Sequence, residues 1–503
     1  MTTAIVVGSG PNGLAAAVTL ARHGVEVTVL EGAATIGGGT RSGELTLPGL
    51  LHDHCAMAHP MAVGSPFWNG IDSARYGLTW AWPEIDCVHP LDDGTAAVLH
   101  RSLEDTAAGL GHDGPIWRRL FAGPSAGYEA LATDFMQPLL RIPSHPLRLA
   151  RFGIPSLIPA AALGRLFRTE QGRALFAGNM AHGWQPQHRI LSAAIGLGIT
   201  TAGHRYGWPV AVGGSRAITD AMAAALRELG GKIETGFWVE SLDQLPPTDL
   251  VIFDLAPAAI ADIAGDRLPS RISRAYRRFR HGPAAYKVSL AVEGGIPWTN
   301  PHAHKAGSLH ICGSAADVVR AEHAVHQGRL SDRPFIVVGQ QYLADPTRSR
   351  GNVHPIDLYA HVPQGYSEDI TEVLLGAVER FAPGFRDRIL ATTVVGPTDM
   401  QAYNPNYVAG DILTGDKNVR QLVFGGPRIT RRPYRVADRM FICSAAVPPG
   451  PGAHGMSGYN AAIAALREEY REASSPARFA FPAGIEATHE RRGDTARGVQ
   501  SGE

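Results

Sequence analysis

AIVVGSGPNG, residues 4–13, is an apolar run that passes directly into a Gly-x-Gly-x-x-Gly pattern. Residues 14–22 continue with the composition of a helix, and residues 25–30 alternate valine with other residues before they reach Glu31. This order of strand, glycine turn, helix and strand is that of one βαβ unit of a dinucleotide-binding domain. The N-terminal segment therefore predicts a Rossmann-type fold.

Each position of the glycine turn has a stereochemical role. Gly8 permits the tight turn, Gly10 lets backbone approach a pyrophosphate, and Gly13 lets the helix pack against the strand. The helix N-terminus offers free N–H groups to the anion. Glu31 is placed to accept hydrogen bonds from ribose hydroxyls. The pattern does not distinguish FAD from NAD, and its predicted cofactor contacts are Gly8, Ser9, Gly10, Pro11, Asn12, Gly13 and Glu31.

Length and composition exclude several classes of protein. A chain of 503 residues exceeds the ~250 to 300 residues at which one hydrophobic core stops growing, so two domains are expected. The 46 basic and 46 acidic residues balance, which argues against a nucleic-acid partner. The four cysteines are scattered and form no C-x-x-C pair, which indicates a reducing compartment. We expect a cytoplasmic protein that is either soluble or attached peripherally to a membrane.

Two later blocks repeat the order of glycine turn and helix. Residues 212–239 predict a glycine turn, a helix over 216–230 and a strand over 232–239, and residues 440–470 predict a strand, a loop rich in proline and glycine, and a helix that begins around Gly458. Residues 286–292, 308–312, 334–341 and 355–362 are typical of strands of an antiparallel sheet. The predicted fold class is α/β, with a discontinuous Rossmann-type domain and a mixed α+β substrate domain. Its predicted parts are a nucleotide domain over 1–75, 205–262 and 431–472, a substrate domain over 76–204 and 263–430, and a disordered tail over 473–503.

The segment after Glu31 resembles the phytoene desaturase-like flavoproteins, within the wider class that includes the amine oxidases. It reads Gly37-Gly38-Gly39-Thr40-Arg41, where that family continues its pyrophosphate site with Gly-Gly and an arginine. The resemblance implies FAD as cofactor and Gly38, Gly39, Thr40 and Arg41 as contacts. Here the arginine arrives only after Gly39 and Thr40, so an exposed surface arginine is the alternative for Arg41.

The resemblance continues in both later blocks. In the first, it implies that Val239 lies on the adenine side of the cofactor, although packing in the core would explain the same residue. In the second, a Gly-x-x-Gly turn that opens a helix would offer backbone donors to the flavin ring, where negative charge collects on reduction. The implied contacts of this block are Ser444, Gly455, Met456 and Ser457.

A second dinucleotide pattern and a redox cysteine pair are both missing from the sequence, which argues against a pyridine-nucleotide disulfide reductase. The electrons would then pass between an apolar small-molecule substrate and oxygen, a quinone or another carrier. The resemblance implies desaturation, saturation or isomerisation of carbon–carbon bonds in a carotenoid- or lipid-like substrate. One rival is a flavin amine oxidase, with Tyr403 and Tyr407 as an aromatic pair; the other is a catalytically idle FAD-binding protein that binds a partner.

Candidate catalytic residues are few. His454 lies beside the implied flavin contacts, where an imidazole could move a proton, but a histidine that stiffens the loop is the alternative. His52, Asp53 and His54 are adjacent in an extended segment, which sends neighbouring side chains to opposite faces. We therefore expect no metal site.

Residues 135–169 combine five arginines with many leucines and lack acidic residues, while prolines divide the segment into short pieces. One interpretation is a set of short lid helices over a substrate tunnel. The other is a contact with an anionic membrane surface that admits a lipid.

Overall fold

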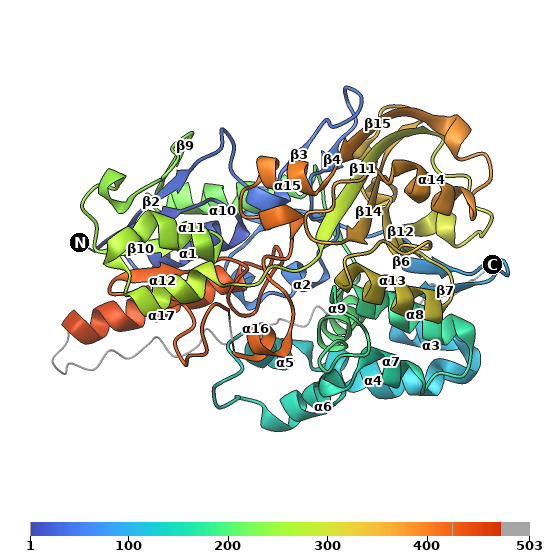
Figure 1. Ribbon diagram of the computed structural model, residues 1–503, viewed down its shortest axis with the longest axis horizontal. Helices are drawn as coiled ribbons and strands as arrows, with labels where there is room; N and C mark the ends of the chain where they lie inside the picture. Colours follow the sequence, from blue (N-terminus) through green and yellow to red (C-terminus); the bar gives the residue numbers. More distant parts are fainter. Residues whose placement is uncertain (1, 425, 474–503) are drawn as a thin grey trace, which may run out of the picture.

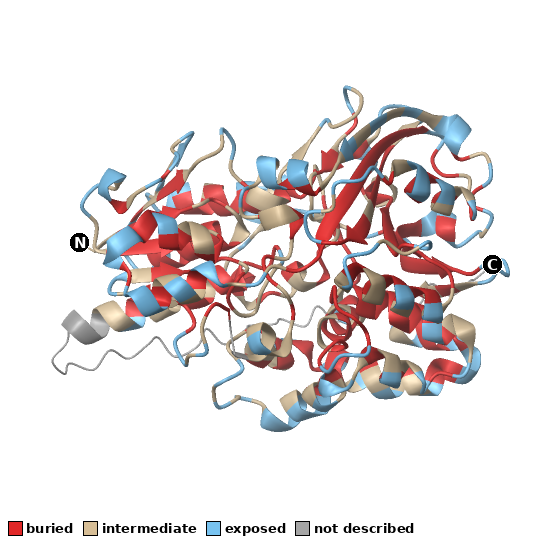
Figure 2. Cartoon of the chain, viewed as in Figure 1, coloured by how far each residue is buried: buried red, intermediate tan, exposed pale blue. Residues whose placement is uncertain are grey.

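The computed structural model describes residues 2–424 and 426–473, which form two sheets side by side with a layer of helices below one of them (Figure 1). Their central strands are buried, and the outward helix faces and loop tips are exposed (Figure 2). No helix among the described residues is long and apolar enough to span a bilayer. The predicted disordered tail lies outside the described residues, apart from residue 473.

The first sheet has six strands and forms the Rossmann-type half of the molecule. Five of its strands are parallel, and only the edge strand at residues 435–437 is antiparallel. In sheet order the strands are β16 (Arg435–Ala437), β17 (Met440–Ile442), β10 (Leu250–Phe253), β1 (Thr3–Val7), β2 (Glu26–Glu31) and β9 (Lys232–Thr235). The central strands β10 and β1 are nearly continuous apolar runs, as expected for strands covered on both faces, whereas β2 alternates valine with other residues.

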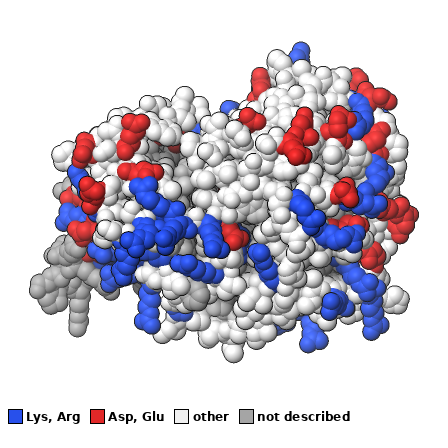
Figure 3. Space-filling model, in the orientation of Figure 1, with Lys and Arg blue, Asp and Glu red and all other residues white. Residues whose placement is uncertain are grey.

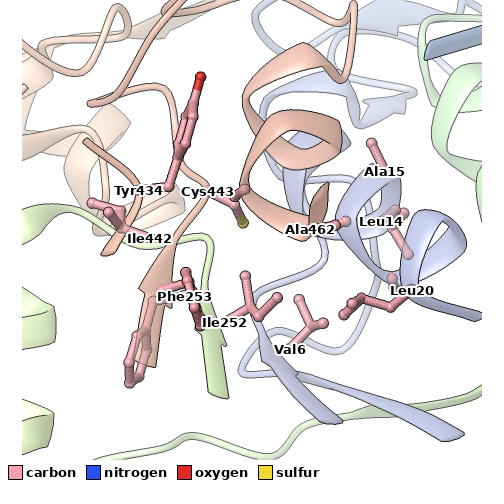
Figure 4. Close-up of a cluster of buried hydrophobic side chains, with 14 of the residues drawn as sticks. Val6, Leu14, Ala15, Leu20, Ile252, Phe253, Tyr434, Ile442, Cys443 and Ala462 are labelled. Atoms are coloured by element: carbon pink, nitrogen blue, oxygen red, sulfur yellow. The ribbon is translucent and has the colours of Figure 1, made fainter. Parts of the chain in front are cut away.

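The helices of this half bring the first and the last described helix together. The first helix packs against the last one, and a cluster of buried side chains joins both to the strands (Figure 4). The two helices cross so closely that a Cβ on Gly458 would lie 1.9 Å from the carbonyl oxygen of Asn12. The helices of this half are α1 (Pro11–Arg22), α10 (Arg216–Glu228), α11 (Pro257–Ala264), α12 (Ser270–Arg277) and α17 (Met456–Ala473).

The second sheet has seven strands and contains all four predicted strands of the substrate half. Its neighbours are antiparallel except for one parallel pair, which joins residues 306–311 to residues 85–90. In sheet order the strands are β15 (Ile389–Val395), β11 (Ala284–Glu293), β14 (Val353–Val362), β13 (Ile336–Gly339), β12 (Ala306–Ile311), β6 (Ile85–Pro90) and β7 (Ala96–Leu99).

A helical layer contacts this second sheet, where a cluster that includes Trp117, Phe121 and Phe176 forms its core. The layer consists of α3 (Leu103–Gly109), α4 (Gly114–Ala126), α5 (Tyr128–Phe135), α6 (Pro146–Leu157), α7 (Ala160–Gly164), α8 (Glu170–Ala181) and α9 (Ala194–Tyr206).

The remaining elements connect these layers. They are the helices α2 (Pro60–Val63), α13 (Ala315–His326), α14 (Thr371–Glu379), α15 (Pro397–Tyr403) and α16 (Val419–Phe424), and the strand pairs β3 (Ser42–Gly43) with β4 (His52–Asp53) and β5 (Trp80–Ala81) with β8 (Val210–Ala211).

Two predicted element boundaries were wrong. The strand expected to reach Val239 ends at Thr235, because its partner β2 ends there and Gly236 turns the chain with a φ of 72°. The helix expected to begin at Gly458 begins at Met456, whose N–H donates to Nδ1 of His454 at 3.0 Å. That bond satisfies an N–H group at the start of the helix, which otherwise has no partner within the helix.

Candidate functional site

A cavity of about 840 Å³ is lined by elements of both halves of the molecule. One part of its wall comes from the glycine turn and the segments that follow β2, β9 and β10, and the other comes from α8, α9, β12, β13 and β14. Most predicted cofactor residues line it, namely Gly8, Ser9, Gly10, Pro11, Asn12, Glu31, Gly38, Gly39, Thr40, Arg41, Val239 and Ser444, and His454 lies in the wall with them. Gly13, Gly455, Met456 and Ser457 are not in the lining.

The glycine turn is shaped for close approach. Gly8 has a φ of 99°, a conformation that favours glycine, and a Cβ on Gly13 would lie 2.2 Å from the carbonyl oxygen of Gly8. Helix α1 begins with Pro11, which has no N–H, and the N–H of Gly13 donates to the side chain of Asp254, so the N–H of Asn12 is the group that the helix start offers to an anion. Within the described chain, Oδ1 of Asn12 is buried without a hydrogen-bond partner. These features fit the pyrophosphate of a dinucleotide.

Asp254 is a site residue that the sequence analysis missed. It follows β10 directly, lines the cavity and accepts a hydrogen bond from the N–H of Gly13 at 2.8 Å. Its removal from bulk water raises its pKa to about 7, and the nearby charge of Glu31 acts in the same direction. Because β10 lies beside β1 in parallel, the two strands end at the same edge of the sheet. That pairing, had it been predicted, would have indicated Asp254.

Glu31 and Arg41 form an ion pair at the edge of the cavity. One carboxylate oxygen of Glu31 accepts from Nη2 of Arg41 at 3.3 Å, and the other accepts from the N–H and hydroxyl of Ser9 at 2.9 and 2.5 Å. Arg41 also donates to the carbonyl of Thr35, and its side chain is only 12% exposed. The alternative of a surface arginine was therefore wrong, because Glu31 and these carbonyls hold the guanidinium against the turn.

Three residues of the C-terminal block point away from the cavity. The N–H of Met456 is bonded to His454, and the hydroxyl of Ser457 donates to the carbonyl of Val447 at 3.2 Å. Gly455 packs against Ala15 and Phe67, where a Cβ would lie 2.8 Å from the side chain of Ala15. In this block the cavity wall consists of Ser444, Ala445 and residues 451–454.

His454 is buried, and its ring is already engaged. Nδ1 of His454 accepts a hydrogen bond from the N–H of Met456. The backbone carbonyl of His454 accepts from the hydroxyl of Ser65 at 2.6 Å. Burial lowers the pKa of His454 to about 4, so the ring is neutral at pH 7. This geometry fits a histidine that fixes the start of α17, which was the alternative for this residue.

The three polar residues of β4 separate as extended backbone requires. His52 pairs with Asp357 at 3.0 Å, Asp53 pairs with Arg348 at 2.6 Å, and His54 stacks on Tyr403 with ring centroids 4.4 Å apart. Within residues 2–424 and 426–473, no group of three or more metal-ligating side chains gathers at one point.

Arg348 joins the parts of the chain that meet behind the cavity. It is fully buried and binds Asp53 at 2.6 Å, Asp345 at 3.1 Å and the carbonyl of Ala211 at 2.9 Å. Burial alone would raise the pKa of Asp53, but Arg348 and the hydrogen bonds from Ser42 and Ser215 hold it below its usual value. The carboxylate is therefore charged and fully paired.

The other part of the cavity wall is aromatic and contains a histidine pair. Its lining includes Trp184, Trp208, Tyr359 and His182. Nε2 of His182 lies 2.9 Å from Nε2 of the fully buried His310. Burial lowers the pKa of His182 to about 3, so the ring is neutral at pH 7. The sequence analysis missed this pair because 128 residues separate its members and neither belongs to a local motif.

The cavity is charged on one side only. Its acidic lining residues are Glu31, Glu240, Asp254 and Asp262, which all lie on the segments that follow β2, β9 and β10. The part of the lining that belongs to α8, α9 and the seven-stranded sheet contains no carboxylate. This part of the wall suits a neutral, apolar molecule.

Tyr403 and Tyr407, the predicted aromatic pair, both line the cavity next to the second glycine turn. The hydroxyl of Tyr403 donates to the carbonyl of Gly38 at 3.3 Å. A Cβ on Gly39 would lie 2.1 Å from the hydroxyl oxygen of Tyr407. Both tyrosines thus pack on residues 38–39, and Tyr403 takes His54 as its stacking partner.

Comparison with known proteins shows what this chain is similar to. Residues 6–69 match the family described as NAD(P)-binding Rossmann-like domain. The chain is 23% identical to pyridine nucleotide-disulfide oxidoreductase domain-containing protein 2 of Rattus norvegicus, over 92% of this chain and 93% of that protein. An oxidoreductase from Methanosarcina mazei matches with a TM-score of 0.59 and 17% identity, over 93% of this chain and 100% of that one. Wild-type putrescine oxidase bound to putrescine matches with a TM-score of 0.57 and 15% identity, over 94% and 99%.

These matches confirm the predicted α/β fold with its Rossmann-type domain. The chain shares its overall fold with oxidoreductases, including an amine oxidase. The resemblance to phytoene desaturases is supported at the level of this broader group and no further.

Proposed function

We propose that the protein is an FAD-dependent oxidoreductase that removes hydrogen from a neutral, apolar substrate. One observation carries the proposal: a single cavity runs from a glycine turn built for a pyrophosphate to an aromatic wall without carboxylates. A cofactor whose dinucleotide part is held at the glycine turn would direct its reactive end toward the aromatic wall. The oxidoreductase fold of the structural neighbours supports this reading.

The residues that would hold FAD come from three segments. The start of α1 and Glu31 would bind the pyrophosphate and ribose, and residues 38–41 would cover them from above the turn. Val239 and Ser444 would add contacts from the two later blocks. Bound FAD would supply an acceptor for a hydride and its two electrons.

The protein's own residues would handle the second hydrogen. An oxidised substrate loses one hydrogen as a hydride and the other as a proton, and the proton needs a base. His182 is the candidate base on the aromatic wall: when its Nε2–H donates to Nε2 of His310, the lone pair of Nδ1 is left to accept the proton of the substrate. Trp184, Trp208 and Tyr359 would orient the substrate and exclude water.

We further propose that the substrate is carotenoid- or lipid-like and reacts at a carbon–carbon bond. The support is the lack of a carboxylate on the aromatic wall, since a protonated amine would meet no opposite charge there. The second candidate is a flavin amine oxidase, which the fold of putrescine oxidase and the presence of Tyr403 and Tyr407 in the lining favour.

The test begins with the visible spectrum of the purified protein. Flavin bands near ~370 and ~450 nm, with FAD released on denaturation, are expected. The loaded protein is then mixed without oxygen with polyenes and unsaturated lipids, or with putrescine and other amines. Bleaching by the first group supports the proposal, and bleaching by amines alone supports the oxidase. A flavin that no donor reduces, in a protein that forms a stable complex, would support the idle binding protein.

A further inference from the structure

Helix α6 carries apolar side chains on two opposite faces, and the fold explains only one of them. Leu149, Phe152 and Ser156 face the core of the helical layer. Leu147, Ile154 and Leu157 recur at helical spacing on the other side, where they are 86%, 64% and 57% exposed. A helix at the surface of a globular protein normally has a polar outer face. The outer face of α6 therefore suits contact with something other than water.

The apolar surface extends beyond α6. Ile142, in the loop before the helix, is 92% exposed, and Ile190 adjoins the end of the helix because the N–H of Leu191 donates to the carbonyl of Leu157 at 3.3 Å. Nine of the 16 large hydrophobic side chains that are exposed in the described chain lie here, so they are concentrated rather than scattered. We define the outer face as Leu139, Leu140, Ile142, Leu147, Ile154, Leu157, Ile158, Leu166 and Ile190.

The charged side chains within residues 135–169 are all positive. Arg148 and Arg151 lie on the helix, where their guanidinium groups contact Gly127 and Gly123. Arg165 and Arg168 follow the end of α7. Residues 135–169 contain no acidic side chain, and no ion pair involves these four arginines within the described chain. In Figure 3 the lower edge of the molecule, where α6 lies, is mostly uncharged with basic groups beside it.

We propose that the outer face docks on an anionic lipid bilayer. Protruding aliphatic side chains can enter the boundary between headgroups and acyl chains, while arginines reach back to the phosphates along their own apolar stems. Charge complementarity selects an anionic surface, which a membrane presents as a broad and deformable face. Of the two interpretations of residues 135–169, this one accounts for the exposed stripe, which a lid helix over a tunnel would bury.

The outer face also lies close to the aromatic end of the cavity. Phe152, on the inner side of α6, packs toward Gly198 of α9, where a Cβ would lie 3.9 Å from its ring. Ile195 and Ile199 of the same helix line the cavity. One layer of helix thus separates the docked surface from the substrate wall. If the proposed function holds, an apolar substrate would leave the bilayer next to its binding site.

The test is sedimentation of the FAD-loaded full chain with vesicles of phosphatidylcholine, either alone or mixed with phosphatidylglycerol. Wild-type protein should bind the mixed vesicles at low salt, and high salt should weaken the binding because it screens the arginines. The double variant L147D/I154D should bind at least about tenfold more weakly, since two aliphatic side chains no longer enter the lipid. R148Q/R151Q should lose the preference for anionic vesicles.

L390D is the matched control, because Leu390 is 51% exposed on β15, which lies on the side of the molecule opposite α6 in Figure 1. It should bind vesicles as the wild type does, and all variants should keep the same melting temperature. The proposal is overturned if wild-type protein does not sediment with either vesicle, or if L147D/I154D binds as well as wild type. Dimerisation in light scattering that L147D/I154D abolishes would assign the face to a second copy instead. Because the readout is binding, the result does not depend on any activity.

Discussion

The two ends of the cavity are built in different ways. The nucleotide end comes mainly from one continuous segment, residues 8–41, in which the turn, the helix start and Glu31 follow each other along the chain. The aromatic end is assembled from α8, α9 and three strands of the second sheet, which contribute one or two residues each. The residues proposed to bind the cofactor are thus close together in the sequence, whereas those proposed to bind the substrate meet only in the folded protein.

The two ends also differ in charge and in hydrogen bonding. All four lining carboxylates lie at the nucleotide end, where backbone N–H groups and Arg41 accompany them. At the aromatic end the polar group is a neutral histidine, held by a second neutral histidine. A change at one end should therefore affect binding of the cofactor, and a change at the other should affect the reaction without loss of the cofactor.

The largest effect is expected from H182Q, which removes the base but keeps a polar side chain. Reduction of the flavin by the best substrate should slow by about 10²- to 10⁴-fold, while flavin content stays at the wild-type level. Stopped-flow absorbance at the flavin band measures the rate. H188Q changes an exposed histidine on the same stretch of chain and should leave the rate unchanged. Added imidazole should partly restore H182A, and an unaltered rate in H182Q would remove His182 from the mechanism.

The next effect is expected from R348L, at the junction behind both ends. The variant leaves the buried carboxylates of Asp53 and Asp345 unpaired, which should lower the free energy of unfolding by about 3 to 5 kcal/mol. Urea unfolding followed by fluorescence measures the change. R386L breaks the exposed pair with Glu372 and should cost less than about 1 kcal/mol. Similar losses in the two variants would show that Arg348 contributes no more than a surface residue.

A smaller loss is expected from G13A, which tests the local character of the nucleotide end. Helix propensity alone would predict a gain of about 0.5 to 1 kcal/mol. The added Cβ would instead meet the carbonyl of Gly8 at 2.2 Å, so we expect a loss of about 1 to 3 kcal/mol and weaker retention of FAD. Thermal unfolding and the ratio of flavin to protein measure both. In G153A, on α6, the added Cβ has no neighbour within 4 Å, so this control should gain stability.

The smallest effect is a pH dependence that D254N should remove. The pKa of Asp254 is raised from its usual 3.8 to about 7 in the folded protein, so its stabilising contribution is complete below pH 3.8 and is lost as the pH rises through about 7. Its ionisation would also place a negative charge next to the pyrophosphate.

FAD affinity should therefore fall by about tenfold between pH 6 and pH 8 in the wild type, and stay flat in D254N. Fluorescence titration of the apoprotein with FAD at each pH measures this, with D262N as a control at another lining carboxylate. Equal slopes in wild type and D254N would assign the dependence to another group.

The sequence predicted the nucleotide end in most of its parts because its signals are local. The glycine turn, the alternating valines and Glu31 predict the βαβ unit within about thirty residues, and the structure has β1, α1 and β2 in this segment. The strands of the second sheet were also predicted from their apolar runs. What failed were boundaries set by tertiary contacts: β9 ends where its partner ends, and α17 starts where His454 binds Met456.

The aromatic end could not be predicted in the same way. His182 and His310 are unremarkable in their own segments, and they meet only because α8 packs against the second sheet. Asp254 needed the pairing of β10 with β1, which short-range patterns do not specify. Whether Arg41 is exposed or paired likewise depends on the groups that surround it in the folded protein, which the sequence near the turn does not specify. Each of these residues became recognisable only after strand order was known.

The crossing of α1 and α17 has a consequence for the synthesis of this protein. The glycine turn and α1, which ends at Arg22, leave the ribosome long before α17, which begins at Met456. At typical rates of about 5 to 20 residues per second, the nascent chain waits on the order of a minute for that helix. Gly458 of α17 then packs closely against Asn12 of α1. Chains that end before α17 would lack this contact, and their proposed cofactor pocket would be incomplete. Retention of FAD would thus report that α17 has been synthesised and has packed on α1.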